Sequence, residues 1–158
     1  TFSIHFPLYE RSMKEFGGHS AAPARAGRDV LSEDSLGNFS GKTALVIDDD
    51  PDSRLILAHL FQKLGMQVIT AGGGEQGIRS ARGKNPDIIT VDLMMRGKNG
   101  WDVIAELKSD PKLSRVPLVV VSAIAEDEAG KLFKDVPRLK KPVDIGDLLQ
   151  ILREKIGP

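Results

Sequence analysis

The fold is decided by residues 44–51, which read Ala-Leu-Val-Ile-Asp-Asp-Asp-Pro. The four apolar residues have no polar alternation, as expected for a central strand that is buried on both faces of a parallel sheet. Three aspartates and a proline follow at once, where such a strand would give way to a helix. We therefore expect a buried strand with carboxylates at its C-terminal end.

Uninterrupted apolar runs recur at 88–91 and 118–121, and helical patterns separate the runs. The pattern over 52–64 predicts an amphipathic helix. Its expected apolar stripe consists of Leu55, Leu57, Leu60, Phe61 and Leu64. A second amphipathic helix is predicted over 144–156, with Asp144 as its N-cap.

Weaker patterns complete an alternation of strands and helices. Strands are expected at 67–70 and 136–140, and helices at 74–82, 100–108 and 127–134. The predicted fold class is α/β, with five βα units that build a five-stranded, doubly wound parallel sheet. In such sheets the ligand site lies beyond the carboxyl ends of the strands, so functional residues are sought there.

The composition is that of a globular chain, and it excludes several classes of site. Hydrophobic residues make up 41% and charged residues 28% of the 158 residues, and 22 basic side chains balance 22 acidic ones. A formal net charge of zero gives no global field for nucleic acid or anionic lipid, so neither is expected as a partner. Disulfides and thiolate metal sites are excluded because the chain has no cysteine. No apolar run approaches the roughly 20 residues of a membrane helix.

The character of the chain changes near residue 41. Residues 42–158 carry the alternating pattern and form the predicted domain, whereas residues 9–41, rich in Gly, Ser and Ala from Gly17 on, are predicted to be a linker. Residues 1–8 alternate between apolar and polar side chains, as a half-buried strand does. This N-terminal extension is interpreted as the last strand of an upstream domain or as a hydrophobic stub, and the start at Thr1 indicates a piece of a longer protein.

Charged and polar side chains stand where the predicted strands end. Asp48 and Asp49 follow the first strand and Asp92 the third, Ser122 ends the fourth, and Lys141 follows the fifth. Several carboxylates at one sheet edge repel each other unless a cation neutralises them, and hard oxygen ligands suit Mg²⁺. This set can hold a phosphoryl group, with an aspartate as acceptor and the hydroxyl and ammonium groups bonded to its oxygens. By itself the acidic run has a second interpretation, the cap of a helix N-terminus.

These residues resemble the receiver domain of two-component response regulators, which has a (βα)5 flavodoxin-like fold. The likeness covers about residues 42–157. Its four pieces, in the family's order and spacing, are Val46-Ile47-Asp48-Asp49-Asp50-Pro51, Val91-Asp92-Leu93-Met94-Met95 leading to Asn99-Gly100, Val121-Ser122-Ala123, and Lys141-Pro142. The resemblance implies that the domain is a phosphoacceptor in a two-component phosphorelay.

The resemblance also implies a role for each residue at the strand ends. Asp92 would be the phosphorylated aspartate, and Ser122 and Lys141 would contact the phosphoryl oxygens. Magnesium would be the cofactor, and its site would consist of Asp48, Asp49, Asp92 and the main-chain carbonyl of Met94. The donor would be a phosphohistidine on its own or a partner kinase core, with a histidine phosphotransfer protein as a further partner. The receiver itself would only assist its own phosphorylation and dephosphorylation.

The chain departs from the family pattern at three places. Arg96 stands where a proline is usual, so the loop after Asp92 is expected to be more mobile and locally basic. Arg138 replaces the aromatic residue that usually moves on activation, which puts the usual aromatic switch in doubt. The stretch before Lys141 is shorter than usual, so the fourth helix is expected to be truncated. A cis peptide bond is expected between Lys141 and Pro142.

The N-terminal residues 1–8, Thr-Phe-Ser-Ile-His-Phe-Pro-Leu, are similar to the closing strand of the ATP-binding domain of sensor histidine kinases. Followed by a linker and a receiver, this order matches a hybrid histidine kinase, in which a receiver follows the kinase core. The parent protein would then be a transferase, and this fragment would be cytoplasmic. A stand-alone response regulator or an adaptor receiver shares the local chemistry and is the alternative.

Two other interpretations account for parts of the sequence. Residues 72–77 contain a Gly-x-Gly-x-x-Gly pattern with Asp92 about 20 residues on, as in dinucleotide-binding folds, but this gives no reason for the acidic run. A phosphohydrolase with an aspartyl nucleophile would use Asp48, with Asp50 as the acid–base group. That interpretation lacks a substrate cap, for which the predicted domain leaves no room.

Overall fold

The structure, a computed structural model, describes residues 37–123 and 129–157. The strand predicted at 1–8, most of the linker predicted at 9–41 and the start of the helix predicted at 127–134 lie outside the described residues. Within the described part of the chain, no helix is both long enough and apolar enough to cross a membrane.

Five parallel strands form one sheet. They are β1 (Thr43–Ile47), β2 (Gln67–Ala71), β3 (Ile88–Val91), β4 (Leu118–Ser122) and β5 (Arg138–Lys140), in the order β2-β1-β3-β4-β5. The order reverses direction between β1 and β3, which is where a doubly wound sheet places its ligand site. The predicted five-stranded, doubly wound parallel sheet is therefore confirmed.

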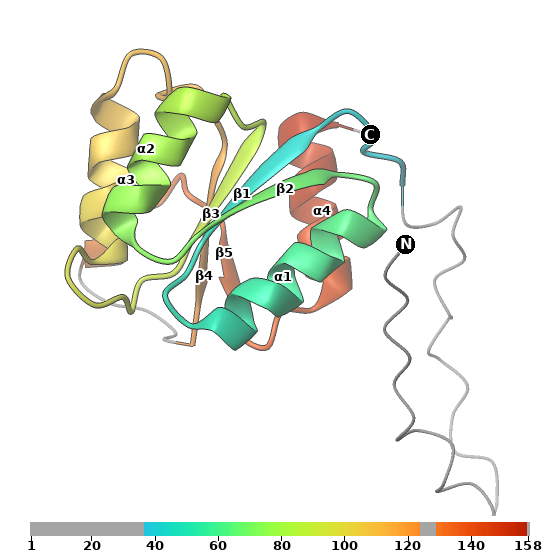
Figure 1. The fold of residues 1–158 in the computed structure, drawn as a ribbon, viewed down its shortest axis with the longest axis horizontal. Coiled ribbons are helices and arrows are strands. Elements are labelled where there is room, and N and C mark those ends of the chain that lie inside the picture. Colours follow the sequence, from blue (N-terminus) through green and yellow to red (C-terminus); the bar gives the residue numbers. More distant parts are fainter. Residues whose placement is uncertain (1–36, 124–128, 158) are drawn as a thin grey trace, which may run out of the picture. The chain divides into compact units, whose positions relative to one another are not determined.

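Four α-helices cover the two faces of the sheet (Figure 1). They are α1 (Pro51–Lys63), α2 (Gly74–Lys84), α3 (Gly100–Ser109) and α4 (Ile145–Ile156). Helices α2 and α3 lie on one face, and α1 and α4 lie on the other. Between β4 and β5, the described residues include a 3-10 helix, η2 (Ala129–Phe133), at the place of the fourth helix of the expected (βα)5 pattern.

The last strand is shorter than predicted, 138–140 in place of 136–140. The amide of Val136 donates to the carbonyl of Phe133 at 3.0 Å, which closes a turn. Pro137 has no amide hydrogen, so neither residue can donate a hydrogen bond to the sheet. The short helix predicted over 127–134 is the 3-10 helix η2 within its described part.

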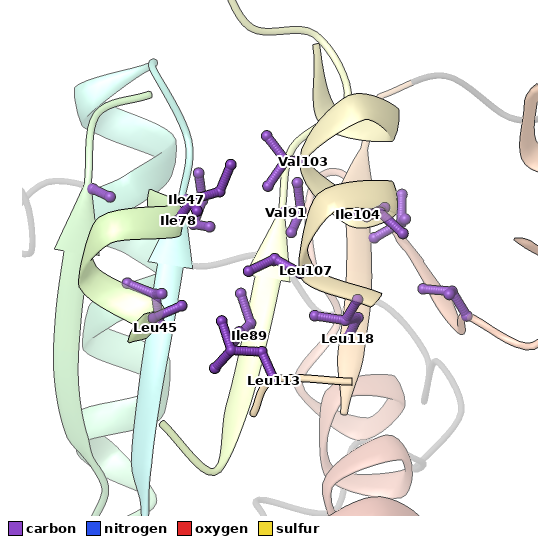
Figure 2. Close-up of a cluster of buried hydrophobic side chains, with 14 of the residues drawn as sticks. Leu45, Ile47, Ile78, Ile89, Val91, Val103, Ile104, Leu107, Leu113 and Leu118 are labelled. Atoms are coloured by element: carbon purple, nitrogen blue, oxygen red, sulfur yellow. The ribbon is translucent and has the colours of Figure 1, made fainter. Parts of the chain in front are cut away.

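A buried cluster fills the space between the sheet and the helices α2 and α3 (Figure 2). Alternate residues of the central strands point into it, including Leu45, Ile47, Ile89 and Val91. The α3 residues Val103, Ile104 and Leu107 close it from the side of the helices. The strands bury apolar side chains on both faces, which explains why their sequences lack polar alternation.

The second cluster packs α1 and α4 on the opposite face of the sheet. Leu57, Phe61 and Leu64 of the predicted stripe are buried there. Leu55 was predicted to join them, but the prediction is wrong because its side chain is 56% exposed. It stands two residues before Leu57, so at about 100° per residue it points to the far side of the helix.

Aspartates cap α1 and α4, the two helices on one face of the sheet. The Asp50 carboxylate accepts from the amides of Asp52 at 3.4 Å and Ser53 at 3.2 Å, and starts α1. Asp144 accepts from the amide of Gly146 at 2.7 Å and starts α4, which confirms the predicted N-cap. These caps satisfy amides that have no partner within the helix.

A short segment before β1 is anchored in the core by Phe39, which lies within the predicted linker 9–41. Its side chain is fully buried in the cluster beneath α1. Its amide donates to the carbonyl of Leu64 at 3.1 Å, and its carbonyl accepts from the amide of Lys42 at 3.0 Å. The packed domain thus begins before residue 42.

We expect Phe39→Ala to lower the free energy of unfolding by about 3 kcal/mol or more, because truncating a buried phenylalanine leaves a cavity. Urea unfolding of the domain measures the change. Leu132→Ala is the matched control, since the Leu132 side chain is 80% exposed. Surface substitutions of this kind change stability by about 0.5 kcal/mol or less. Equal stabilities for the two variants would contradict a core role for Phe39.

Candidate active site

Two buried carboxylates stand side by side at the carboxyl edge of the sheet. Asp48 follows β1 and Asp92 follows β3, and these strands are direct neighbours. The amide of Asp48 donates to the carbonyl of Ala71 at 3.1 Å, and that of Asp92 donates to the carbonyl of Ile47 at 2.9 Å. The sheet's hydrogen bonding therefore continues through both residues and fixes their backbones. Their exposed fractions are only 3% and 6%.

Asp49 completes a cluster of three carboxylates. One oxygen from each of Asp48, Asp49 and Asp92 lies within 4.8 Å of the others. Asp49 is half-buried, so the cluster opens to solvent on its side. Carboxylate oxygens that converge with room for further ligands match the chemistry of Mg²⁺. The donor set therefore fits the magnesium site expected from the sequence.

Each of the three carboxylates also accepts a main-chain amide. The carboxylate of Asp48 accepts from the amide of Asp50 at 2.9 Å, and that of Asp92 accepts from the amide of Met94 at 3.2 Å. The carboxylate of Asp49 accepts from the amide of Arg96 at 3.0 Å. These bonds orient the three side chains.

Lys141 brings an ammonium group to the cluster from the end of β5. Its Nζ lies 2.7 Å from Asp48 Oδ2 and 3.2 Å from Asp92 Oδ2. Its amide donates to the carbonyl of Ser122 at 3.0 Å. The peptide bond between Lys141 and Pro142 is cis, as predicted.

The electrostatics of the cluster reflect an excess of negative charge. Burial raises the pKa of Asp48 and outweighs the opposing hydrogen bonds from Lys141 and the Asp50 amide, while the charge of Asp92 raises it further. Burial works to lower the pKa of Lys141, but its bonds to Asp48 and Asp92 outweigh burial and the pKa is raised. Lys141 therefore stays cationic. One ammonium group cannot neutralise three carboxylates, so the site favours an added cation.

The structure thus brings together Asp48, Asp49, Asp92 and Lys141, four of the six residues predicted for the site. Ser122 lies at the same sheet edge, 2% exposed, and its carbonyl is tied to Lys141. Met94 sits on the rim, with a side chain that is 65% exposed. A metal bond from its main-chain carbonyl and a phosphoryl contact from the Ser122 hydroxyl stay predictions.

Sequence reasoning missed Arg54. Its Nη1 donates to the main-chain carbonyl of Asp48 at 2.7 Å and so supports the peptide between the first two aspartates. The position of Arg54, one turn after the Asp50 cap, is a weak signal. A bond to a main-chain carbonyl depends on tertiary geometry and leaves no pattern in the sequence.

Arg138, which stands where the family usually has an aromatic residue, lies against an aromatic pair. Its guanidinium carbon is 4.9 Å from the centre of the Trp101 ring, within the range of cation–π contacts. The Trp101 and Phe133 rings are stacked, with centroids 5.4 Å apart and planes inclined by 7°. This stack joins β5, α3 and η2.

The glycines of the dinucleotide-type pattern serve packing. They follow β2, the edge strand, and not the strand at the switch point. A Cβ at Gly77 would come within 2.4 Å of Ile47 Cδ1, and one at Gly74 within 2.6 Å of Val103 Cγ2. The two glycines allow α2 to approach β1 and α3 closely. This accounts for the pattern without a nucleotide.

The phosphohydrolase interpretation also lacks support. Asp50, its proposed acid–base group, is exposed and uses its carboxylate to cap α1. Hydrogen bonding to Ser53 lowers the pKa of Asp50, so this carboxyl group favours its ionised form, which has no proton to donate.

The chain matches known proteins of one family. The family model described as response regulator receiver domain matches residues 44–153. Protein PilH of Pseudomonas aeruginosa is 32% identical over 111 residues, which cover 68% of this chain and 92% of PilH. Hybrid signal transduction histidine kinase D of Dictyostelium discoideum is 32% identical over 83 residues, which cover 52% of this chain and 5% of that kinase.

Solved structures share the fold. The receiver domain of the sensor histidine kinase PA1611 from Pseudomonas aeruginosa, with a magnesium ion coordinated in its active site cleft, has a TM-score of 0.69 and 25% identity, and the match covers 75% of this chain and 100% of that one. The chemotaxis protein CheY4 of Vibrio cholerae has a TM-score of 0.67 and 23% identity, covering 73% of this chain and 98% of that one. The second likeness concerns the fold alone.

We expect millimolar Mg²⁺ to raise the melting temperature of the wild-type domain. A ligand that binds only the folded state stabilises it by about 2.7 kcal/mol at 100 times its dissociation constant. Asp49→Asn should raise the melting temperature of the metal-free protein, because one of three mutually repelling charges is removed, and should lose most of the Mg²⁺ response. Thermal melts in Mg²⁺ and in EDTA measure both effects.

Asp52→Asn is the matched control for the metal, since Asp52 is an exposed acid in the first turn of α1 that is not in the cluster. It should keep the full Mg²⁺ response. A wild-type melting temperature that is indifferent to millimolar Mg²⁺ would contradict the metal site.

Proposed function

The chain belongs to the family of response regulator receiver domains, and we propose that it accepts a phosphoryl group on Asp92 from a phosphohistidine donor in a two-component phosphorelay. The observation that carries the proposal is the pairing of a 6% exposed carboxylate, Asp92, with the ammonium group of Lys141 inside a cluster of acids. Such a pair offers a nucleophilic oxygen beside a cation that can neutralise a phosphoryl oxygen.

The proposed step is a transfer between two covalent partners. A carboxylate oxygen of Asp92 forms a bond to phosphorus, and the bond between phosphorus and the donor's imidazole nitrogen breaks. The electron pair of that bond returns to the imidazole. Lys141 holds the developing charge on one phosphoryl oxygen, and Ser122 donates its hydroxyl hydrogen to another.

Asp48, Asp49, Asp92 and the main-chain carbonyl of Met94 would hold Mg²⁺. The ion would offset the charge of the acids and of the incoming phosphoryl group. Support comes from the converging carboxylates and from the magnesium ion coordinated in the receiver domain of PA1611. The amides of Asp50 and Met94 fix the orientation of two of the carboxylates before the ion binds.

An apolar groove beside α1 gives the donor a place to dock. The groove has a volume of about 370 Å³, and Asp48 and Lys141 line it together with Ile56, Pro142 and Val143. On the outer side of α1, Leu55 and Ile56 are 56% and 62% exposed. Apolar surface that leads to a charged acceptor fits the apolar stripe of a helix that carries the donor histidine at its centre.

Two settings for the domain share this chemistry. We favour a cytoplasmic hybrid histidine kinase, a transferase, in which residues 1–8 close the ATP-binding domain and the predicted linker 9–41, except for its packed end around Phe39, connects it to the receiver. The similarity to hybrid signal transduction histidine kinase D supports this setting. The alternative is a stand-alone regulator, which the similarity to nearly the full length of PilH supports.

We expect incubation with acetyl phosphate and Mg²⁺ to add the mass of one phosphoryl group to the wild-type protein. Asp92→Asn should gain none, because an amide oxygen is a poor nucleophile and forms no stable acyl phosphate. Intact-mass spectrometry measures the change, with EDTA in place of Mg²⁺ as the second negative condition. Asp102→Asn, an exposed acid at the start of α3, is the matched control and should be modified like the wild type. Full modification of Asp92→Asn would overturn the acceptor.

We expect Ile56→Glu to slow phosphorylation by a protein donor about tenfold or more, because a charge in the centre of an apolar interface is costly. The donor is a phosphorylated histidine phosphotransfer protein, and phosphoramidate serves as the small donor that needs no docking surface. Leu132→Glu, on η2, is the matched control. The docking surface is wrong if Ile56→Glu slows both donors equally or neither of them.

A further inference from the structure

The loop after Asp92 is tied down, although its sequence lacks the usual proline. Arg96 stands at that position, and the loop was expected to be more mobile for this reason. In the structure the Arg96 amide donates to the carboxylate of Asp49 at 3.0 Å. The loop thereby orients one of the three aspartates of the cluster. Contacts that hold the loop in place therefore affect the geometry of the metal site.

Lys98 anchors this loop to two helices. Its Nζ lies 3.2 Å from Glu75 of α2 and forms a second ion pair with Glu106 of α3. The hydrogen bonds to Glu106 and Glu75 raise the pKa of Lys98, and the bond to Lys98 lowers the pKa of Glu106. The Lys98 side chain is only 24% exposed, so this pair is better shielded from water than most surface pairs.

Neighbouring residues of α2 and α3 leave room for the Lys98 side chain and hold its partner Glu106. A Cβ at Gly74 would lie 3.1 Å from Lys98 Cβ, so the missing side chain at the start of α2 leaves room for the lysine stem. Glu106 is held from its other side by Arg82 at 3.4 Å, and Arg82 bonds Asp110 at 2.9 Å. Lys98 therefore joins a network of charges that is fixed on α2 and α3.

Only Gly97 separates the anchored lysine from the amide that contacts Asp49. Gly97 has a φ of +80°, a left-handed conformation that turns the chain between the two contacts. After Lys98, the amide of Gly100 donates to the carbonyl of Leu93 at 3.2 Å and closes the loop. The position of the Arg96 amide is thus constrained on both sides.

We propose that Lys98 is a positioning residue for the metal site: its ion pairs with Glu106 and Glu75 hold the loop so that the Arg96 amide orients Asp49. The inference rests on the proposed function, because it assigns Lys98 a share in the Mg²⁺ affinity of that site. The ion pairs of Lys98 are with Glu75 and Glu106, and not with the three aspartates of the cluster. The effect of Lys98 passes through the backbone of the loop.

The direction of the change in Mg²⁺ affinity distinguishes a positioning role of Lys98 from a purely electrostatic one. Removing a positive charge near an acidic cluster strengthens cation binding by electrostatics alone. Loss of the Lys98 ion pairs frees the loop and weakens Mg²⁺ binding, because ordering the loop and Asp49 on binding then costs conformational entropy. A weaker affinity after loss of the lysine charge therefore indicates positioning.

The test compares Lys98→Met with Lys108→Met in the whole chain. Lys108 forms an ion pair of the same kind with Asp135, and its side chain is 32% exposed. Isothermal titration with MgCl2 should show about threefold to fivefold weaker binding for Lys98→Met, an effect of the size that one partly shielded ion pair can supply. Lys108→Met should bind at least as tightly as the wild type. Lys98→Arg should recover most of the lost affinity, because the guanidinium group keeps the charge and reaches the same acids.

Amide hydrogen exchange gives a second readout that needs no metal. The Arg96 amide should exchange faster in Lys98→Met and in Glu106→Gln, and at the wild-type rate in Lys108→Met. Unchanged exchange at Arg96 in Lys98→Met, or equal Mg²⁺ affinities for the two lysine variants, would overturn the positioning role alone. A wild-type protein that binds no Mg²⁺ would overturn the metal site of the proposed function as well.

Discussion

The contact of one ammonium group with two buried carboxylates is the interaction on which the site depends. Lys141 reaches Asp48 at 2.7 Å and Asp92 at 3.2 Å, and in the sequence it lies 93 residues after Asp48 and 49 after Asp92. Two like charges on adjacent strands are costly to bury without such a counterion. The contact therefore joins the end of β5 to the ends of β1 and β3, and it leaves Asp49 as the uncompensated acid that favours a metal ion.

The parallel sheet makes this arrangement possible. Both β1 and β3 are buried on their two faces, so packing from α2 and α3 on one side and from α1 on the other fixes their register. Loops carry the remaining parts of the site. Amides of these loops donate hydrogen bonds to the carboxylates of Asp48, Asp49 and Asp92. The strand ends therefore fix where the three aspartates stand, and the loop backbone orients their side chains.

The sequence predicts those features that follow from local pattern. Apolar runs without alternation identify the central strands, and polar residues at the strand ends identify the site, because parallel strands share one edge. Features that need tertiary contacts escape this reasoning. Phe39 lies in a Gly- and Ser-rich stretch yet is fully buried, and Leu55 looks apolar enough for the core but faces outward. The hydrogen bonds of Arg54 and Arg96 involve main-chain atoms, and every residue type has these, so the sequence does not indicate such bonds.

We propose that Asp92 is the one acceptor in the cluster of three acids. The most direct measurement is to phosphorylate the wild-type protein, reduce the acyl phosphate with borohydride and locate the resulting homoserine by peptide mapping. We expect homoserine at Asp92 alone, because the proposed transfer makes Asp92, which follows the central strand β3, the acceptor, while Asp48 and Asp49 only hold the ion. Homoserine at Asp48 or Asp49 would contradict the assignment.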